Sequence, residues 1–494
     1  MSELDKLHEM RRLSGEAMTL GLSDDVIAIF LQQDPRLRDA INNGYLLFHQ
    51  LAVNEADKQF LLKNERDLVN CLQKGIVNFY DPDSVNPYVP LAASGPWMVT
   101  SHGAVLHDSG GYGMLGFGQN KEQLNQALTQ NQVIANVMTA SFSQKRMVNA
   151  LNEEVGHTRR KKITPYEYLF LNSGSEGMTL ASRLSDLNAL QQTQAGASHE
   201  GKTSRFISLK GSFHGRTDRP AQVSHSSQKA YQQSLYSFQK LDNLLTVTPN
   251  DVTELQSVVD KAIQDGFFIE AIFMEPVMGE GDPGLAIQPA FYAKARELMS
   301  KHGGLMIVDS VQAGIRATGY LSIMDYPGFR DLPPPDIEVF SKAINGGQYP
   351  LSVIGLNDKV KEFFKIGLYG NTMTANPRAM DVGCAVLTAL EQPLRDNIAE
   401  MGRLALEKFS ALQTKYPAII TKVQGTGLLF SVSLAPEVAN VVGENGIEKQ
   451  LRQNGIGVIH GGHNALRFTP HFGLTEAELD LMVSEVDKVF APLS

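Results

Sequence analysis

Short β-like runs alternate with helical patterns between about residue 165 and residue 356 of this chain. The candidate strands are residues 168–171, 206–209, 269–274, 305–308, 337–340 and 351–354. Helical spacing lies between several of them, for example over residues 288–302. This alternation predicts an α/β layer structure with a largely parallel sheet. In such sheets ligands bind beyond the carboxyl ends of the strands, so the residues that follow each run are the first candidates for a functional site.

The rest of the chain has a different character, and 494 residues are too many for a single core. Residues 1–85 carry helical spacing and predict a helical N-terminal extension. Turn-forming residues at 81–90 indicate a boundary, after which a large α/β domain is expected over residues 86–390. One long helical pattern covers residues 378–407. β-like pieces at 420–423, 428–432, 457–459 and 466–468 and a helix at 475–490 then predict a smaller α+β domain over residues 391–494.

Composition excludes several classes of protein. The net charge of -9 argues against a nucleic-acid surface, which normally needs a basic face. No apolar run approaches the ~18 residues of a membrane span, and the N-terminus lacks the apolar core of a signal peptide. The two cysteines, Cys71 and Cys384, make a disulfide framework improbable and indicate a cytoplasmic protein. Zinc-protease, paired-cysteine and Gly-x-Ser-x-Gly signatures are absent, so no metal is expected.

Polar groups follow three of the candidate strands: Lys342, Asp309 and the loop Ser173-Gly174-Ser175. Small residues before a helix let backbone N–H groups approach an anion. A carboxylate at the end of a buried strand is costly unless paired, and a buried lysine there can become nucleophilic. Taken singly, each feature also fits an ordinary turn, a helix cap or salt bridge, or a solvated lysine. Together they are the groups that pyridoxal phosphate (PLP) requires for its phosphate, its pyridine nitrogen and its aldehyde.

Two further side chains have both a functional and a structural interpretation. The Phe213 ring, after the run at 206–209, could cover the face of a planar cofactor or simply belong to the core. The Arg467 guanidinium could clamp a carboxylate through two hydrogen bonds or form a structural salt bridge. The glycine pattern at 111–116 matches a dinucleotide motif, but the acidic residue expected ~20 positions later is missing. A nicotinamide-dependent oxidoreductase therefore ranks third among the candidate functions, after a PLP-dependent enzyme and a non-catalytic PLP-fold binding protein.

In their order and spacing these segments resemble the class III PLP-dependent aminotransferases, which include ornithine, acetylornithine and 4-aminobutyrate transaminases. The resemblance covers roughly residues 95–494. The matching segments are Ser173-Gly-Ser-Glu176, Phe213-His-Gly215, Glu275-Pro-Val-Met-Gly-Glu-Gly281, Asp309-Ser-Val-Gln312, Ser341-Lys342 and residues 371–377. The resemblance implies a fold type I PLP-transferase structure. This comprises a large domain with a mostly parallel sheet flanked by helices and a smaller α+β C-terminal domain.

The same resemblance implies roles for individual residues. Lys342 would be the catalytic Schiff-base lysine, and Asp309 would pair with the pyridine nitrogen. The other cofactor-binding residues would be Ser173, Gly174, Ser175, Phe213, His214, Glu275, Gln312 and Thr372, with Thr372 reaching the phosphate of a neighbouring subunit. Arg467 would bind the substrate's α-carboxylate. The Thr372 match implies a homodimer with shared active sites.

The expected function is transfer of an amino group from an amino acid or ω-amine to a 2-oxo acid by a ping-pong mechanism. Ser310 stands where the family has glutamate, and Thr374 and Ala375 replace two glycines, so the amino donor and acceptor stay open. The alternatives are another PLP reaction on the same fold, namely that of an aminomutase, racemase, decarboxylase or lyase, or a non-catalytic PLP-fold binding protein.

Overall fold

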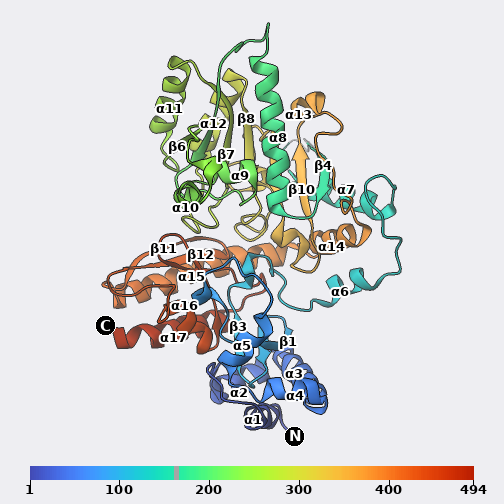
Figure 1. Ribbon diagram of the computed structural model, residues 1–494, viewed down its shortest axis with the longest axis vertical. Helices are drawn as coiled ribbons and strands as arrows, with labels where there is room; N and C mark the ends of the chain where they lie inside the picture. The colour runs from blue at the N-terminus through green and yellow to red at the C-terminus, as the bar shows by residue number, and fades with distance from the viewer. Residues whose placement is uncertain (161–165, 494) are drawn as a thin grey trace. The chain divides into compact units, whose positions relative to one another are not determined.

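A seven-stranded sheet lies at the centre of one of the two units into which the chain divides (Figure 1). The computed structural model describes residues 1–160 and 166–493. Unit 1 comprises residues 1–122, 400–424 and 430–494, and unit 2 comprises residues 123–399 and 425–429. The three-part division expected from the sequence remains a prediction.

The strands of unit 2 follow the order β4-β10-β9-β8-β7-β5-β6. Their bounds are β4 Glu167–Leu171, β5 Ser204–Leu209, β6 Leu244–Val247, β7 Phe268–Met274, β8 Leu305–Asp309, β9 Ile337–Phe340 and β10 Ser352–Leu356. Strand β10 is antiparallel to both its neighbours, β4 and β9, whereas the pairs from β9 to β6 are parallel. The largely parallel α/β sheet is therefore confirmed, with β10 running against the others.

Helices cover both faces of this sheet, because successive residues of a strand point to opposite sides. In β7, Ile272 and Met274 belong to the same hydrophobic cluster as residues of α11 (Val252–Gln264) and α12 (Pro289–His302). Ala271 and Phe273 belong to a second cluster, with residues of α8 (Gly174–Thr193). Figure 1 shows α8 running along the sheet. All of β7 is buried, in keeping with an apolar sequence that only Glu270 interrupts.

Further helices of unit 2 surround this core. They are α6 Glu122–Thr129, α7 Phe142–Glu154, α9 Asp218–Val223, α10 Gln228–Ser234, α13 Asp358–Phe363 and α14 Pro377–Thr388, with 3-10 turns η3 His225–Ser227, η4 Tyr236–Phe238, η5 Ile323–Asp325 and η6 Lys342–Asn345. The single helix predicted over residues 378–407 is wrong, because α14 ends at Thr388 and α15 (Gln392–Lys415) begins a separate helix. Pro393 lies in the first turn of α15, where its missing N–H is tolerated; within a continuous helix it would remove a hydrogen bond.

Unit 1 combines helices with two small sheets. Its N-terminal helices are α1 Glu3–Leu13, α2 Asp24–Gln33, α3 Pro35–Val53, α4 Glu55–Leu61 and α5 Glu65–Gln73. One sheet has the order β1-β2-β3-β13, with β1 Pro90–Ser94, β2 Trp97–Thr100, β3 Val105–Asp108 and β13 Ile456–Gly457. The other has the order β11-β12-β15-β14, with β11 Ile420–Thr426, β12 Leu429–Leu434, β15 Ala465–Phe468 and β14 Ile459–Gly461.

The remaining elements of unit 1 are α16 Ile447–Gln453, α17 Glu476–Phe490 and the turns η1 Pro82–Ser84, η2 Gly111–Gly113 and η7 Ala491–Leu493. Within the described residues, no helix combines the length and the hydropathy that crossing a bilayer requires.

Candidate active site

Six strands of unit 2 point in the same direction, and five of them end in the loops that concern the site. β5, β7, β8 and β9 are mutually parallel through their neighbours, and β4 shares their direction because β4 and β9 are both antiparallel to β10. The segments after these strands carry most of the residues singled out in the sequence. The structure thus brings to one edge the loops that begin at residues 172, 210, 275, 310 and 341.

The loop after β4 is tightly packed. The Ser173 hydroxyl accepts a hydrogen bond from the Glu176 N–H at 3.2 Å and caps α8. A Cβ on Gly174 would lie 2.8 Å from Cγ1 of Val311 and 3.5 Å from Cβ of Ser341. Only glycine fits between the loop after β8 and the loop after β9 without moving them. The start of a long helix at this point is a favourable place for a phosphate.

Asp309, the last residue of β8, and His214, in the loop after β5, form a buried pair. Nδ1 of His214 lies 3.0 Å from Oδ2 of Asp309, and the Val311 N–H donates to Oδ1 at 3.1 Å. Both side chains are 6% exposed or less. Nε2 of His214 is buried without a hydrogen-bond partner. The carboxylate is therefore held in one orientation by donors on both of its oxygens.

Glu275, directly after β7, links the loop after β7 to the loop that carries His214. Its carboxylate accepts hydrogen bonds from the Phe213 N–H at 3.0 Å and the Gly279 N–H at 2.8 Å. Burial raises the pKa of Glu275; His214 opposes this rise and the charge of Asp309 adds to it. The Gln312 side chain packs directly on Gly279, where any Cβ would overlap it. These contacts fix the backbone beneath Phe213 and Gln312.

The Phe213 ring is half-buried, and the guanidinium of the exposed Arg216 lies over it, 5.4 Å from its centroid. One face of the ring is therefore next to a charged group, and its role toward a cofactor remains a prediction.

Lys342 begins the η6 turn directly after β9 and is half-buried. Its φ of 51° lies in the left-handed region, which costs a non-glycine residue roughly 1 kcal/mol. The neighbouring Ser341 hydroxyl donates to the Leu351 carbonyl at 2.8 Å and helps to hold this conformation. Backbone strain of this kind concentrates at active sites.

Glu176 anchors a second loop to the start of α8. Its carboxylate accepts hydrogen bonds from the Asn172 N–H at 2.8 Å, from the Asn371 side chain at 2.7 Å and from the Tyr369 hydroxyl. Thr372, next to this anchor, is exposed. Glu176 lies inside the Ser-Gly-Ser-Glu motif, but the sequence did not indicate that it holds the loop carrying Thr372.

Arg467 belongs to unit 1, whereas the cluster above belongs to unit 2. It lies in β15, opposite Ser431 of β12 and Ile459 of β14, and is 8% exposed. Its role toward a substrate carboxylate remains a prediction.

The residues of unit 2 fit PLP. An amine on a strained backbone, an oriented buried carboxylate and a glycine-lined helix start match the aldehyde, the pyridine nitrogen and the phosphate of that cofactor. The buried Nε2 of His214, which has no partner, is a further polar atom at this edge.

Comparisons with known proteins agree with this interpretation. A family model described as "Aminotransferase class-III" matches residues 79–490. The ornithine aminotransferase of Staphylococcus epidermidis is 27% identical over 429 residues, covering 84% of this chain and 98% of that protein. The acetylornithine aminotransferase of Xanthomonas axonopodis pv. citri is 28% identical over 377 residues, covering 75% and 85%.

Solved structures show the same fold. A structure of the ornithine aminotransferase from Toxoplasma gondii, described as having partial occupancy of PLP at its active site, aligns with a TM-score of 0.72. It is 22% identical and covers 89% of this chain and 96% of its own. The N-acetylornithine aminotransferase of Stenotrophomonas maltophilia aligns with a TM-score of 0.65 at 20% identity, covering 85% and 98%.

Proposed function

Because this chain belongs to the class III aminotransferase family and is a PLP-dependent transaminase, we propose that Lys342, Asp309 and the loop at 173–175 are its working groups. The observation that carries this proposal is the packing around Gly174, which touches both the residue before Lys342 and the loop after Asp309. Three segments far apart in the sequence thereby meet at one place.

When bound, PLP supplies an electron sink that stabilises negative charge at the α-carbon of an attached amine. The Lys342 amine would bind its aldehyde and later carry a proton to and from the substrate's α-carbon. The Asp309 carboxylate, which His214 holds in place, would accept a hydrogen bond from the pyridine N–H. The backbone at Ser173, Gly174 and Ser175 would bind the phosphate.

The remaining residues of the cofactor site would contact the cofactor or hold a neighbouring residue in place. The Phe213 ring would cover one face of the cofactor, and Gln312, packed on Gly279, would lie near its phenolic oxygen. Glu275 would hold the Phe213 backbone through the hydrogen bond at 3.0 Å. Arg467 would bind the α-carboxylate of the substrate.

The substrates are proposed to be an ω-amino acid as donor and a 2-oxo acid as acceptor, since relatives at 27–28% identity are named for ornithine and acetylornithine. One set of residues would serve both substrates in turn, which predicts ping-pong kinetics. Double-reciprocal lines at several acceptor concentrations should be parallel, and intersecting lines would exclude this order. Turnover without an acceptor would instead favour an aminomutase, racemase, decarboxylase or lyase.

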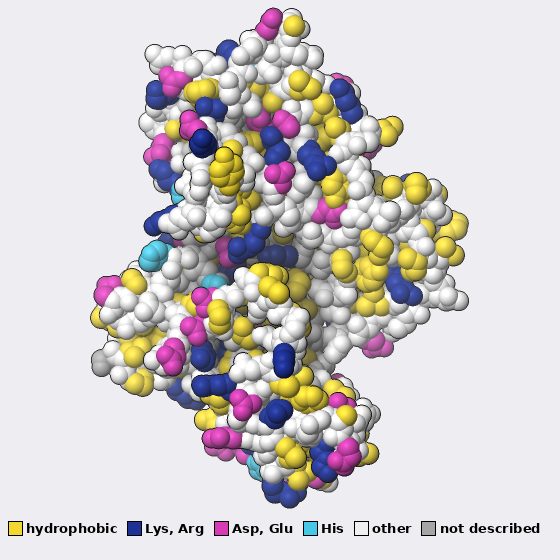
Figure 2. All heavy atoms as spheres, in the orientation of Figure 1, with side chains coloured by type: hydrophobic (Ala, Val, Ile, Leu, Met, Phe, Trp, Pro, Cys, Tyr) yellow, Lys and Arg dark blue, Asp and Glu magenta, His cyan; other side chains and the backbone are white. Residues whose placement is uncertain are grey.

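We also propose a homodimer with shared active sites. Exposed apolar side chains gather on the segment joining α6 to α7, at the start of α7 and at the adjacent loop: Val133, Ile134, Val137, Met138, Phe142 and Met373. Figure 2 shows apolar side chains gathered over this part of unit 2, at the right of the view. The Asn136 side chain donates to the Thr372 carbonyl at 3.3 Å, so this apolar patch is continuous with Thr372. A patch of this kind marks a protein interface.

The two cysteines, both free and half-buried, suit a reducing compartment, and we place the enzyme in the cytoplasm.

Borohydride reduction of the PLP-loaded protein, followed by peptide mapping, tests the central assignment. The pyridoxyl label should lie on Lys342, and Lys342→Ala protein should carry none. A label on another lysine would refute the assignment. Full activity of the Lys342→Ala variant in its biological setting would support a non-catalytic binding protein instead.

A further inference from the structure

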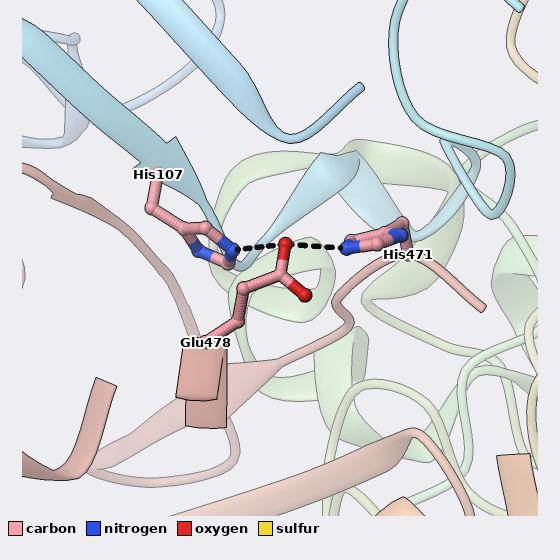
Figure 3. Close-up of side chains that lie close together, drawn as sticks. All are labelled: His107, His471 and Glu478. Carbon is pink, nitrogen blue, oxygen red and sulfur yellow. Dashed lines mark hydrogen bonds and ion pairs between the residues drawn. The ribbon is translucent and has the colours of Figure 1, made fainter. Parts of the chain in front are cut away.

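Three side chains from distant parts of the sequence meet inside unit 1 (Figure 3). His107 lies in β3, His471 follows β15, and Glu478 lies in the first turn of α17. Their side chains are 0%, 4% and 2% exposed. One ligand atom from each, all within 4.8 Å of one another, could hold a metal ion.

The two imidazoles direct Nε2 toward the same carboxylate oxygen. Nε2 of His107 lies 3.6 Å from Oε1 of Glu478, and Nε2 of His471 lies 3.1 Å from it. The other oxygen, Oε2, is already occupied as a helix cap, because it accepts hydrogen bonds from the N–H and hydroxyl of Thr475 at 2.7 and 2.8 Å. Oε1 is thus the oxygen left for the two histidines.

His107 is held as a metal-binding histidine would be. Its Nδ1 lies 2.9 Å from the Ser109 hydroxyl, which can accept a hydrogen bond from Nδ1–H and so leave the lone pair on Nε2. Nε2 is fully buried, yet it has no hydrogen-bond partner. A buried polar atom without a partner is costly, and a bound cation would satisfy it.

We propose that His107, His471 and Glu478 bind one divalent transition-metal ion of the zinc class. Imidazole nitrogen and carboxylate oxygen are the ligands that zinc accepts in His₂Glu sites. An ion in the plane of the three atoms and equidistant from them would lie about 2.4 Å or less from each, close to the ~2.0–2.2 Å that zinc takes with nitrogen and oxygen.

The Arg36 guanidinium lies near the proposed site, and Asp34 neutralises its charge. Nη2 of Arg36 lies 3.7 Å from Oε1 of Glu478. Asp34 neutralises this guanidinium through hydrogen bonds of 2.8 Å to Nε and 2.7 Å to Nη2, and it also accepts from the Trp97 indole at 2.7 Å. The Glu478 charge therefore remains available to the metal.

The metal would have a structural role. It would tie β3 and the segment after β15 to α17, and the Arg36–Asp34–Trp97 contacts would extend this link to α3 of the N-terminal region. The sequence carries no metal motif because these ligands do not share one helix or loop, which explains why none was expected.

The test measures zinc and cobalt binding to the untagged, PLP-loaded full-length enzyme after metal removal. Equilibrium dialysis with zinc chloride should give one equivalent per chain. Cobalt(II) should give visible absorption bands of a low-coordinate nitrogen and oxygen site. His107→Gln and His471→Gln should each weaken zinc binding at least about 100-fold, and Ser109→Ala about 10-fold. His463→Gln, which removes an exposed histidine of unit 1, is the matched control and should leave binding unchanged.

Zinc should also raise the Tm of the wild-type enzyme and of His463→Gln, but not that of His471→Gln. Absence of stoichiometric zinc in the wild-type protein, or zinc whose affinity His471→Gln and His463→Gln alter equally, would overturn the proposal. The histidines would then be only hydrogen-bonding partners of Glu478. The cobalt spectrum of the wild-type protein decides the outcome even if a variant fails to fold.

Discussion

Nδ1 of His214 lies 3.0 Å from Oδ2 of Asp309, although the two residues are 95 positions apart in the chain. The pair joins the loop after β5 to the last residue of β8, and both side chains are buried. A carboxylate in this setting keeps one orientation because a ring nitrogen and a backbone N–H hold its two oxygens. The orientation of the Asp309 carboxylate therefore depends on both the loop after β5 and the loop after β8.

Replacing His214 should impair catalysis without removing the cofactor. His214→Leu deletes a hydrogen bond to a charged group, worth about 1.5–3 kcal/mol, so kcat should fall roughly 10- to 100-fold. Borohydride labelling of Lys342 should persist. His214→Gln, which can still donate, should recover part of the loss. An unchanged kcat in His214→Leu would show that this pair does not position Asp309.

Gly174 should tolerate no side chain. Gly174→Ala would place Cβ 2.8 Å from Val311, and such overpacking costs typically 1–3 kcal/mol. We expect a lower free energy of unfolding and weaker PLP binding, measured by denaturant titration and cofactor fluorescence. Gly370→Ala is the control, since nothing lies within 4 Å of a Cβ there. Equal behaviour of the two variants would contradict the packing described here.

Glu176 should control the loop that carries Thr372. Glu176→Gln places an amide where the Asn172 N–H, the Asn371 amide and the Tyr369 hydroxyl all donate. The loop at 365–374 should then be cleaved faster by proteases, and PLP should dissociate faster. Glu167→Gln, at an exposed carboxylate of unit 2, serves as the control. Identical cleavage in both variants would mean that the anchor contributes nothing.

The contribution of Glu338 to the free energy of unfolding should fall as pH rises. This fully buried carboxyl has its pKa raised by burial to about 7, although the hydroxyls of Ser310 and Ser322 oppose the shift. The folded state therefore binds the proton more tightly than the unfolded state. The resulting stabilisation is complete below pH ~4.5 and is lost as pH rises through ~7.

Between pH 4.5 and 8, the free energy of unfolding should fall by up to about 3 kcal/mol less in Glu338→Gln than in the wild-type protein. Denaturant unfolding of both proteins at several pH values measures it. Parallel curves for the wild-type and variant proteins would exclude Glu338 as a source.

A charge in the apolar patch next to Thr372 should separate the proposed dimer. Val137→Asp and Met138→Asp introduce a carboxylate at positions 65% and 85% exposed in the single chain. Sedimentation should show a shift toward monomer together with loss of activity. Leu190→Asp, at a position 58% exposed on α8, should remain dimeric and active. An active monomer would argue against shared active sites.

Local sequence determined the strands of unit 2 and the polar residues that follow them. Apolar runs such as 305–308 are buried on both faces, so their pattern predicts strands without knowledge of their partners. Asp309 stands out because it ends such a run with a charge, and Lys342 because it follows the short run at 337–340 and precedes a glycine pair. Strands with weaker signals were missed, including β1 (Pro90–Ser94) and β6 (Leu244–Val247), most of whose residues are only partly buried.

Only the tertiary structure decided which of these residues meet. Strand order places His214 against Asp309 and Gly174 against Val311, and no local pattern encodes strand order. The two-residue strand β13 exists because it pairs with β3, and His107, His471 and Glu478 come together through packing in the same unit. Backbone propensity acts over a few neighbouring residues. Contacts between residues far apart in the sequence depend instead on how whole helices and strands bury their apolar faces against one another. That packing is determined by the complete chain.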